Sequence, residues 1–65
     1  MKSRIKFNSR KFDMALARAN LELSELAKIA DVGRNSLYNA RDRGVRPLTA
    51  GKIARGLGVE LSELM

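Results

Sequence analysis

Cysteine and histidine are both absent from the 65 residues of this chain. Without cysteine no disulfide can form, and the common zinc sites lose their usual ligands. A histidine base and a cysteine nucleophile are also excluded, which removes many catalytic schemes. No other base pairs with a nucleophile in a recognisable pattern. We therefore expect no enzyme, no catalytic residue, no metal ion and no cofactor.

Long apolar runs are absent as well. The longest one near the basic N-terminus is MALA, residues 14–17, which is too short for the apolar core of a secretory signal. Nothing in the chain approaches the length of a transmembrane span. The sequence therefore predicts a protein without a membrane partner.

Basic residues dominate the charge, since 13 Lys and Arg stand against 7 Asp and Glu and give a net charge of +6. Residues 1–18 and 34–55 are both strongly basic, whereas residues 19–33 and 56–65 are acidic. Apolar residues make up 45% of the chain, which suits a single globular domain and argues against disorder. Two basic segments on one small domain indicate a polyanionic partner.

Apolar residues recur at helical spacing in several segments that are bounded by capping and stop signals. The pattern predicts helices over about residues 10–19, 23–30 and 34–42, the first of them capped by Asn8 or Ser9 and stopped by Asn20. After a loop at residues 43–47, Thr49 is expected to cap a fourth helix that Gly58 ends, and Val59, Leu61 and Leu64 anchor a short fifth helix. We expect an all-α fold of five short helices without a sheet.

Residues 1–9 precede this helical domain, which spans residues 10–65. Arg4 and Lys6 alternate with Ile5 and Phe7, which is the period of a strand, yet no second strand candidate exists to pair with them. We expect a basic arm, or a short strand that needs a partner chain, with a frayed tail as the alternative.

A connection of about three residues, Asp31 to Gly33, joins the second and third expected helices. So short a turn makes the helices cross steeply, and the small Ala27 suits the crossing point. Val32 is expected to point into the angle, and Leu37 to face the core. This combination predicts helix-turn-helix geometry, in which the second helix of the pair enters the major groove of DNA.

Residues 26–41, LAKIADVGRNSLYNAR, and 52–64, KIARGLGVELSEL, resemble the phage-repressor-like helix-turn-helix family, also called the Cro or Xre type. The resemblance spans about residues 10–65 and is carried, in order, by Leu26, Ala27, Asp31, Val32, Leu37, Ile53, Ala54, Leu57, Gly58 and Val59. It implies a compact, five-helix, lambda-repressor-like domain.

The chain departs from the family pattern at three places. Asp31 stands where the turn usually has Gly, and Asp visits the left-handed region more easily than most residues. Leu23 stands where the family has a Gln that often contacts DNA, so that contact is not expected here. The loop at residues 41–47 is shifted by one residue.

Candidate DNA contacts follow from the resemblance and from side-chain chemistry, because arginine can bind guanine bidentately and asparagine can pair with adenine. The expected base readers are Arg34, Asn35, Tyr38 and Asn39, on the surface opposite Leu37 and Ala40. The expected contacts to the DNA backbone are Gly33, Ser36, Arg41, Arg43 and Arg46, joined by arm contacts from Lys2, Arg4 and Lys6. Two alternatives stay open: Tyr38 packs over the first helix, or the arginines near Asp42 form local ion pairs.

The sequence as a whole predicts a sequence-specific regulator of transcription that binds a double-stranded DNA operator. We expect a repressor of phage, mobile-element or bacterial origin, located in the bacterial cytoplasm or nucleoid or in the host cytoplasm, without a small-molecule substrate. A homodimer would place two third helices in successive major grooves, about 34 Å apart. The alternative is a helix-turn-helix interaction module, such as an antirepressor or an accessory subunit of a regulator.

Overall fold

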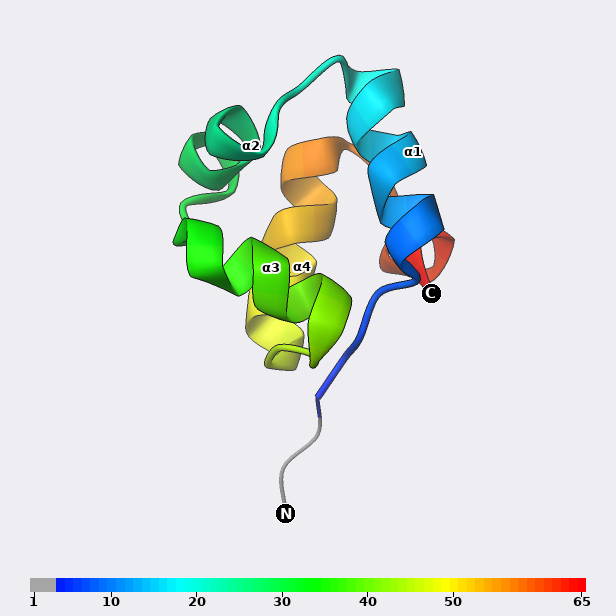
Figure 1. The fold of residues 1–65 in the computed structure, drawn as a ribbon, viewed down its shortest axis with the longest axis vertical. Coiled ribbons are helices and arrows are strands. Elements are labelled where there is room, and N and C mark those ends of the chain that lie inside the picture. Colours follow the sequence, from blue (N-terminus) through cyan, green and yellow to red (C-terminus); the bar gives the residue numbers. More distant parts are fainter. Residues whose placement is uncertain (1–3) are drawn as a thin grey trace.

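Short helices joined by tight turns make up the part of the chain that the computed structural model describes, residues 4–65. In chain order they are α1 (Ser9–Ala19), α2 (Leu23–Ala30), α3 (Arg34–Asp42), α4 (Pro47–Leu57) and the 3-10 helix η1 (Leu61–Leu64). Figure 1 shows α3 lying across α4, with α1 and α2 on either side of them. These described residues form an all-α domain without strands, as the sequence predicts.

Capping residues set most of the helix boundaries. Asn8 begins α1, because its side-chain oxygen accepts a hydrogen bond from the backbone N–H of Lys11 at 3.0 Å. Asn20 ends α1 in the left-handed conformation, at φ 60°. Glu22 and Glu25 form a capping box at the start of α2, in which the Glu25 carboxylate accepts from the Glu22 N–H at 2.9 Å. The predictions for the first three helices are confirmed to within one residue.

The predicted start of the fourth helix is wrong. Thr49 does not cap it, because α4 begins at Pro47 and Arg46 occupies the N-cap position. Proline is favoured at the first helical position, since its fixed φ suits the helix and its missing N–H would have no partner there. The expected fifth helix forms only as the single 3-10 turn of η1, and Val59 lies before that turn.

Apolar side chains from every element meet in one core. Its largest fully buried members are Phe7, Phe12, Leu26, Leu37, Ile53 and Leu64. Helix α4 packs against α2 and η1, and α1 and α3 close the remaining sides. No helix within residues 4–65 is long and apolar enough to cross a bilayer.

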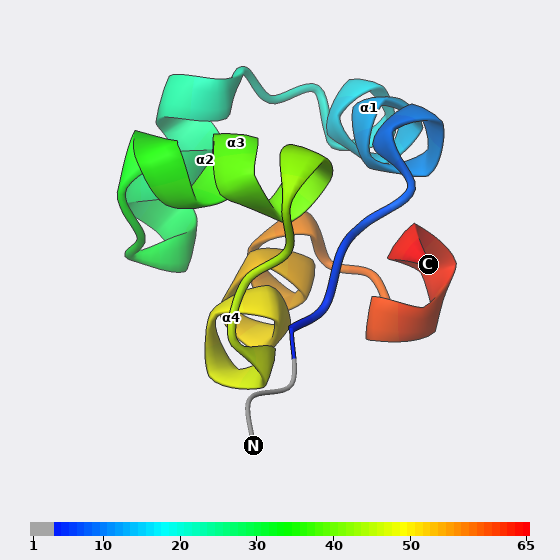
Figure 2. The same ribbon diagram turned by 60° about the horizontal axis from the view of Figure 1, so that its bottom comes forward.

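The N-terminal segment is part of this core, which corrects the expectation of a strand that needs a partner chain. Ile5 forms an antiparallel bridge with Val45 of its own chain, through hydrogen bonds of 2.8 and 2.9 Å. The backbone N–H of Phe7 donates to the carbonyl of Ala40 at 2.8 Å, and its ring is buried 5.7 Å from that of Phe12. Figure 2 shows the segment passing alongside the loop between α3 and α4.

We expect Phe7→Ala to lower the free energy of unfolding by about 3–5 kcal/mol, because it removes a fully buried ring from the core. Chemical denaturation measures the change. Met14→Ala is the control, since Met14 is exposed and its loss should change stability by less than about 0.5 kcal/mol. Equal stabilities of the Phe7 and Met14 variants would show that the N-terminal segment does not contribute to the stability of the fold.

Candidate nucleic-acid interface

The turn between α2 and α3 has the conformation that the sequence predicts. Asp31 lies in the left-handed region, at φ 59° and ψ 49°, and closes α2 through its backbone N–H. The N–H of Val32 then donates to the carbonyl of Ala27 at 3.0 Å, and its side chain packs half-buried against the core. The chain therefore changes direction within three residues, so α3 starts directly after α2 ends (Figure 1).

Burial of one face of α3 decides which of its side chains reach solvent. Leu37 and Ala40 are both completely buried. Four of the predicted contact residues are exposed on the remaining surface, namely Arg34, Asn35, Tyr38 and Asn39. We call these four residues the polar surface of α3. Tyr38 is 43% exposed, so part of its side chain reaches solvent.

The hydrogen-bonding groups of the polar surface have no partners among the described residues. None of its four side chains makes a hydrogen bond or an ion pair with any other residue between 4 and 65. The start of α3 is similar, because Gly33 is the N-cap and supplies no side-chain cap to the first turn. Unpaired guanidinium, amide and hydroxyl groups therefore lie next to a helix N-terminus that has no side-chain cap. Together these groups can bind a partner that is anionic and offers hydrogen-bonding groups of its own.

Arg41 differs from the other predicted contacts, because it faces α1. Its guanidinium lies 5.9 Å from the centre of the Phe12 ring and 3.5 Å from the carboxylate of Asp13. The alternative of local ion pairs with Asp42 is not seen within residues 4–65, where the ion pair of Arg41 is with Asp13. Asp13 is 28 residues away in sequence, so spacing along α3 gives no indication of this pair. The arrangement leaves Arg41 only partly free for a ligand.

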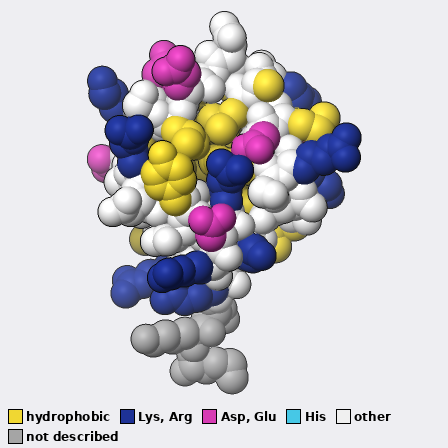
Figure 3. All heavy atoms as spheres, in the orientation of Figure 1, with side chains coloured by type: hydrophobic (Ala, Val, Ile, Leu, Met, Phe, Trp, Pro, Cys, Tyr) yellow, Lys and Arg dark blue, Asp and Glu magenta, His cyan; other side chains and the backbone are white. Residues whose placement is uncertain are grey.

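The other predicted basic contacts come together from two segments that are far apart in the sequence. The bridge between Ile5 and Val45 holds Arg4 and Lys6 beside the loop that carries Arg43 and Arg46. The guanidinium of Arg4 donates to the carbonyl of Gly44 at 3.2 Å. Figure 3 shows Lys and Arg side chains gathered at this end of the molecule. Of the other predicted contacts, Ser36 is half-buried and Lys2 lies outside the described residues.

Comparison of the chain with protein-family models, with curated proteins and with solved structures finds no match.

Gly44 ties the two basic segments together, so we expect Gly44→Ala to lower the free energy of unfolding by at least about 1 kcal/mol. Its φ of 105° strains any residue with a Cβ, and that atom would lie 3.2 Å from Cβ of Arg4 and 3.3 Å from the carbonyl oxygen of Ile5. Faster hydrogen exchange at the amides of Ile5 and Val45 should accompany the loss.

The matched control is Gly51→Ala, the same substitution in the interior of α4. A Cβ at residue 51 meets nothing within 4 Å, so this variant should gain about 0.5–1 kcal/mol from its better helix propensity. A loss of similar size in both variants would contradict the special role of Gly44.

Proposed function

We propose that this chain is a sequence-specific DNA-binding domain of a transcriptional regulator, and that α2 and α3 act as its helix-turn-helix. The observation that carries the proposal is the polar surface of α3, which is exposed, unpaired and fixed directly after a three-residue turn. Its arginine and asparagines are the side chains that best discriminate guanine and adenine in the major groove. The net charge of +6 supports a polyanionic partner.

The proposal gives different tasks to different residues. Arg34 and Asn35, at the start of α3, contact base edges, and Tyr38 and Asn39 extend the contact one turn further. Arg4, Lys6 and Arg43 bind phosphates beside the groove and hold the domain in register, with no contribution to sequence choice. The sequence resemblance to phage-repressor-like domains supports the same division between base-reading and phosphate-binding residues. On that resemblance we extend the proposal to a lambda-repressor-like fold and to a repressor of phage, mobile-element or bacterial origin.

The domain acts on double-stranded DNA in the cytoplasm or nucleoid, by occupying a site and without catalysis or a cofactor. A second copy is part of the proposal, because a single α3 contacts only a few base pairs. Each added base-specific contact contributes about 1–3 kcal/mol of discrimination, so two readers multiply the specificity that one can supply.

Selection of bound duplexes from a random pool tests base reading. The wild-type chain should enrich a defined site, and Arg34→Ala should then bind that site about 1–3 kcal/mol more weakly while its affinity for random DNA changes much less. Arg18→Ala, which removes an exposed arginine at the end of α1, is the control and should affect both duplexes alike. Failure to enrich any sequence would contradict base reading and would favour an interaction module.

The salt dependence of binding tests the phosphate contacts. Replacing Lys6 and Arg43 with Gln should flatten the slope of log K against log salt by about 1.8, since each phosphate contact contributes about 0.9. The control exchanges Arg18 and Lys52 for Gln, because it removes the same charge from exposed positions on α1 and α4. Equal slopes for the two double variants would rule out a dedicated phosphate site at the junction of arm and loop.

A further inference from the structure

Arg41 is held against α1 by two contacts that the side chains of the polar surface do not have. Its guanidinium lies 5.9 Å from the centre of the fully buried Phe12 ring, within the range of a cation–π contact. Its Nη2 lies 3.5 Å from Oδ2 of Asp13, which is the one ion pair within residues 4–65. Neighbouring residues of α1 therefore fix the end of this long side chain.

These contacts contribute little to the stability of the domain. The Asp13 side chain is 55% exposed, and an ion pair in water at this distance stabilises a fold only weakly. The Nε of Arg41 is buried and has no hydrogen-bond partner among the described residues, which disfavours the arrangement. Folding alone therefore does not account for the position of Arg41.

Arg41 continues the polar surface of α3 along one side of the helix. Tyr38 precedes it by three residues and Arg34 by seven, which is the spacing of side chains on one helical face. Arg43 follows two residues later, about 200° further around the helix axis. The polar surface therefore has Arg41 at its α1 edge and Arg43 at the opposite edge, as a helix needs if it is to meet phosphates on both walls of a groove.

The guanidinium of Arg41 keeps a donor for such a contact. Nη2 faces Asp13 and Nε is buried, whereas Nη1 makes no hydrogen bond with any residue between 4 and 65. An arginine fork has donors along more than one edge, so one guanidinium can pair with a carboxylate and a phosphate at the same time. Arg41 can therefore lie between Asp13 and a phosphate and bond to both.

The gain from holding Arg41 in place exceeds the repulsion between Asp13 and that phosphate. A freely rotating arginine loses rotamer freedom when it binds, which can weaken binding by up to about thirtyfold. A side chain that is already held loses less of this freedom. An intervening guanidinium keeps the two anions about 7 Å apart, where their repulsion in water weakens binding by about threefold or less, and salt lowers it further.

We propose that Arg41 contacts a DNA phosphate at the α1 edge of the polar surface, and that Asp13 is the positioning residue that holds it there. This inference rests on the proposed function, and it adds a contact on the groove wall opposite Arg43. The Phe12 ring supports the guanidinium from below.

Binding to a duplex of unselected sequence, measured by fluorescence anisotropy at several salt concentrations, tests the contact without base reading. Arg41→Gln should flatten the slope of log K against log salt by about 0.9. Asp13→Asn should weaken binding at least about threefold, although it removes a negative charge, whereas Asp13→Glu should keep most of the affinity. When Arg41→Gln is already present, Asp13→Asn should not weaken binding, because no guanidinium is left to position.

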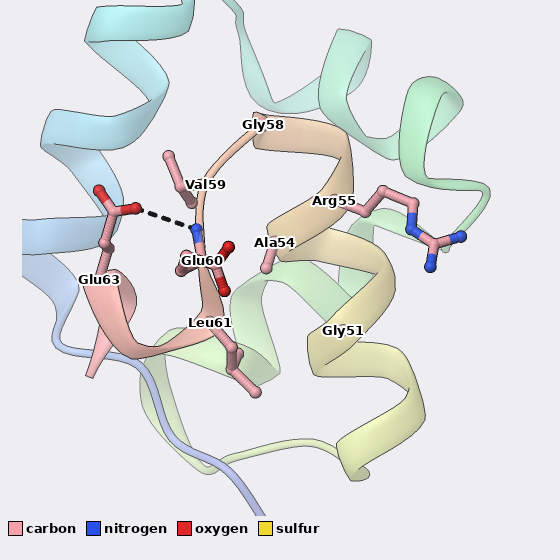
Figure 4. A pocket seen from close by; sticks show the side chains of 8 residues that line it. All are labelled: Gly51, Ala54, Arg55, Gly58, Val59, Glu60, Leu61 and Glu63. Carbon is pink, nitrogen blue, oxygen red and sulfur yellow. Dashed lines mark hydrogen bonds between the residues drawn. The ribbon is translucent and has the colours of Figure 1, made fainter.

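Two exposed residues at the hollow between α4 and η1 supply matched controls, Arg55 and Glu60 (Figure 4). Neither forms an ion pair within residues 4–65, and neither is among the proposed DNA contacts. Arg55→Gln removes the same charge as Arg41→Gln and should leave the salt slope nearly unchanged. Glu60→Gln removes the same charge as Asp13→Asn, keeps a side-chain oxygen for the capping box of η1, and should not weaken binding.

Arg41→Met repeats the test with a long uncharged side chain that still covers the Phe12 ring, and it should flatten the slope as Arg41→Gln does. Thermal unfolding checks that each variant is folded. An unchanged slope in both Arg41 variants would overturn the phosphate contact. Equal effects of Asp13→Asn with and without Arg41 would overturn the positioning role.

The use of unselected DNA separates this inference from the proposed function. If selection enriches no sequence while Asp13 and Arg41 are coupled on unselected DNA, base reading alone fails. If a site is selected but the two residues are not coupled, the inference alone fails. A chain that binds no duplex even at low salt would overturn both.

Discussion

Burial of Leu37 and Ala40 is the constraint on which the rest of this structure depends. Both side chains are fully buried, and this fixes the rotation of α3 about its own axis. The opposite side of the helix must then face solvent, and that side carries two asparagines, an arginine and a tyrosine. A rotation that exposed Leu37 would cost about 2 kcal/mol or more of hydrophobic free energy, so the polar surface is held in place by the core beneath it.

The position of α3 depends in turn on close packing elsewhere. Helix α2 approaches α4 through small residues, and a Cβ on Gly56 would lie 3.1 Å from Cβ of Ala30 and equally close to Leu26. The short turn at Asp31 then leaves α3 little freedom relative to α2. The N-terminal segment adds a further tie, because Phe7 bonds the carbonyl of Ala40 near the end of α3. Helix α3 is therefore held at both ends, by the turn that follows α2 and by the N-terminal segment.

Sequence patterns predict the helices well where the signals are local. Asn20 and Asp31 adopt the left-handed conformation expected of them, since the preference belongs to the residue itself. The cap predicted at Thr49 is wrong because Pro47 starts the helix earlier, at an N-terminus that has no side-chain cap. The bridge from Ile5 to Val45 escapes prediction because Val45 lies in a loop and offers no strand pattern.

Local patterns likewise predict only part of the candidate site. The exposed residues of α3 follow from helical spacing alone, because the period that buries Leu37 also exposes Tyr38. The pairing of Arg41 with Asp13 depends on how α1 sits against α3, which no local pattern encodes. The convergence of Arg4 and Lys6 with the loop after α3 is likewise a tertiary result. It turns two separate basic segments into one surface next to the proposed reading helix.

Backbone amide NMR spectra recorded during titration with a selected duplex show whether the polar surface of α3 contacts DNA. The largest shift changes should cluster at residues 33–39, with smaller ones at residues 4–6 and 43–44. Changes centred on α4 and η1, with the signals of α3 unaffected, would show that DNA binds elsewhere on the domain and that the proposed reading helix is wrong.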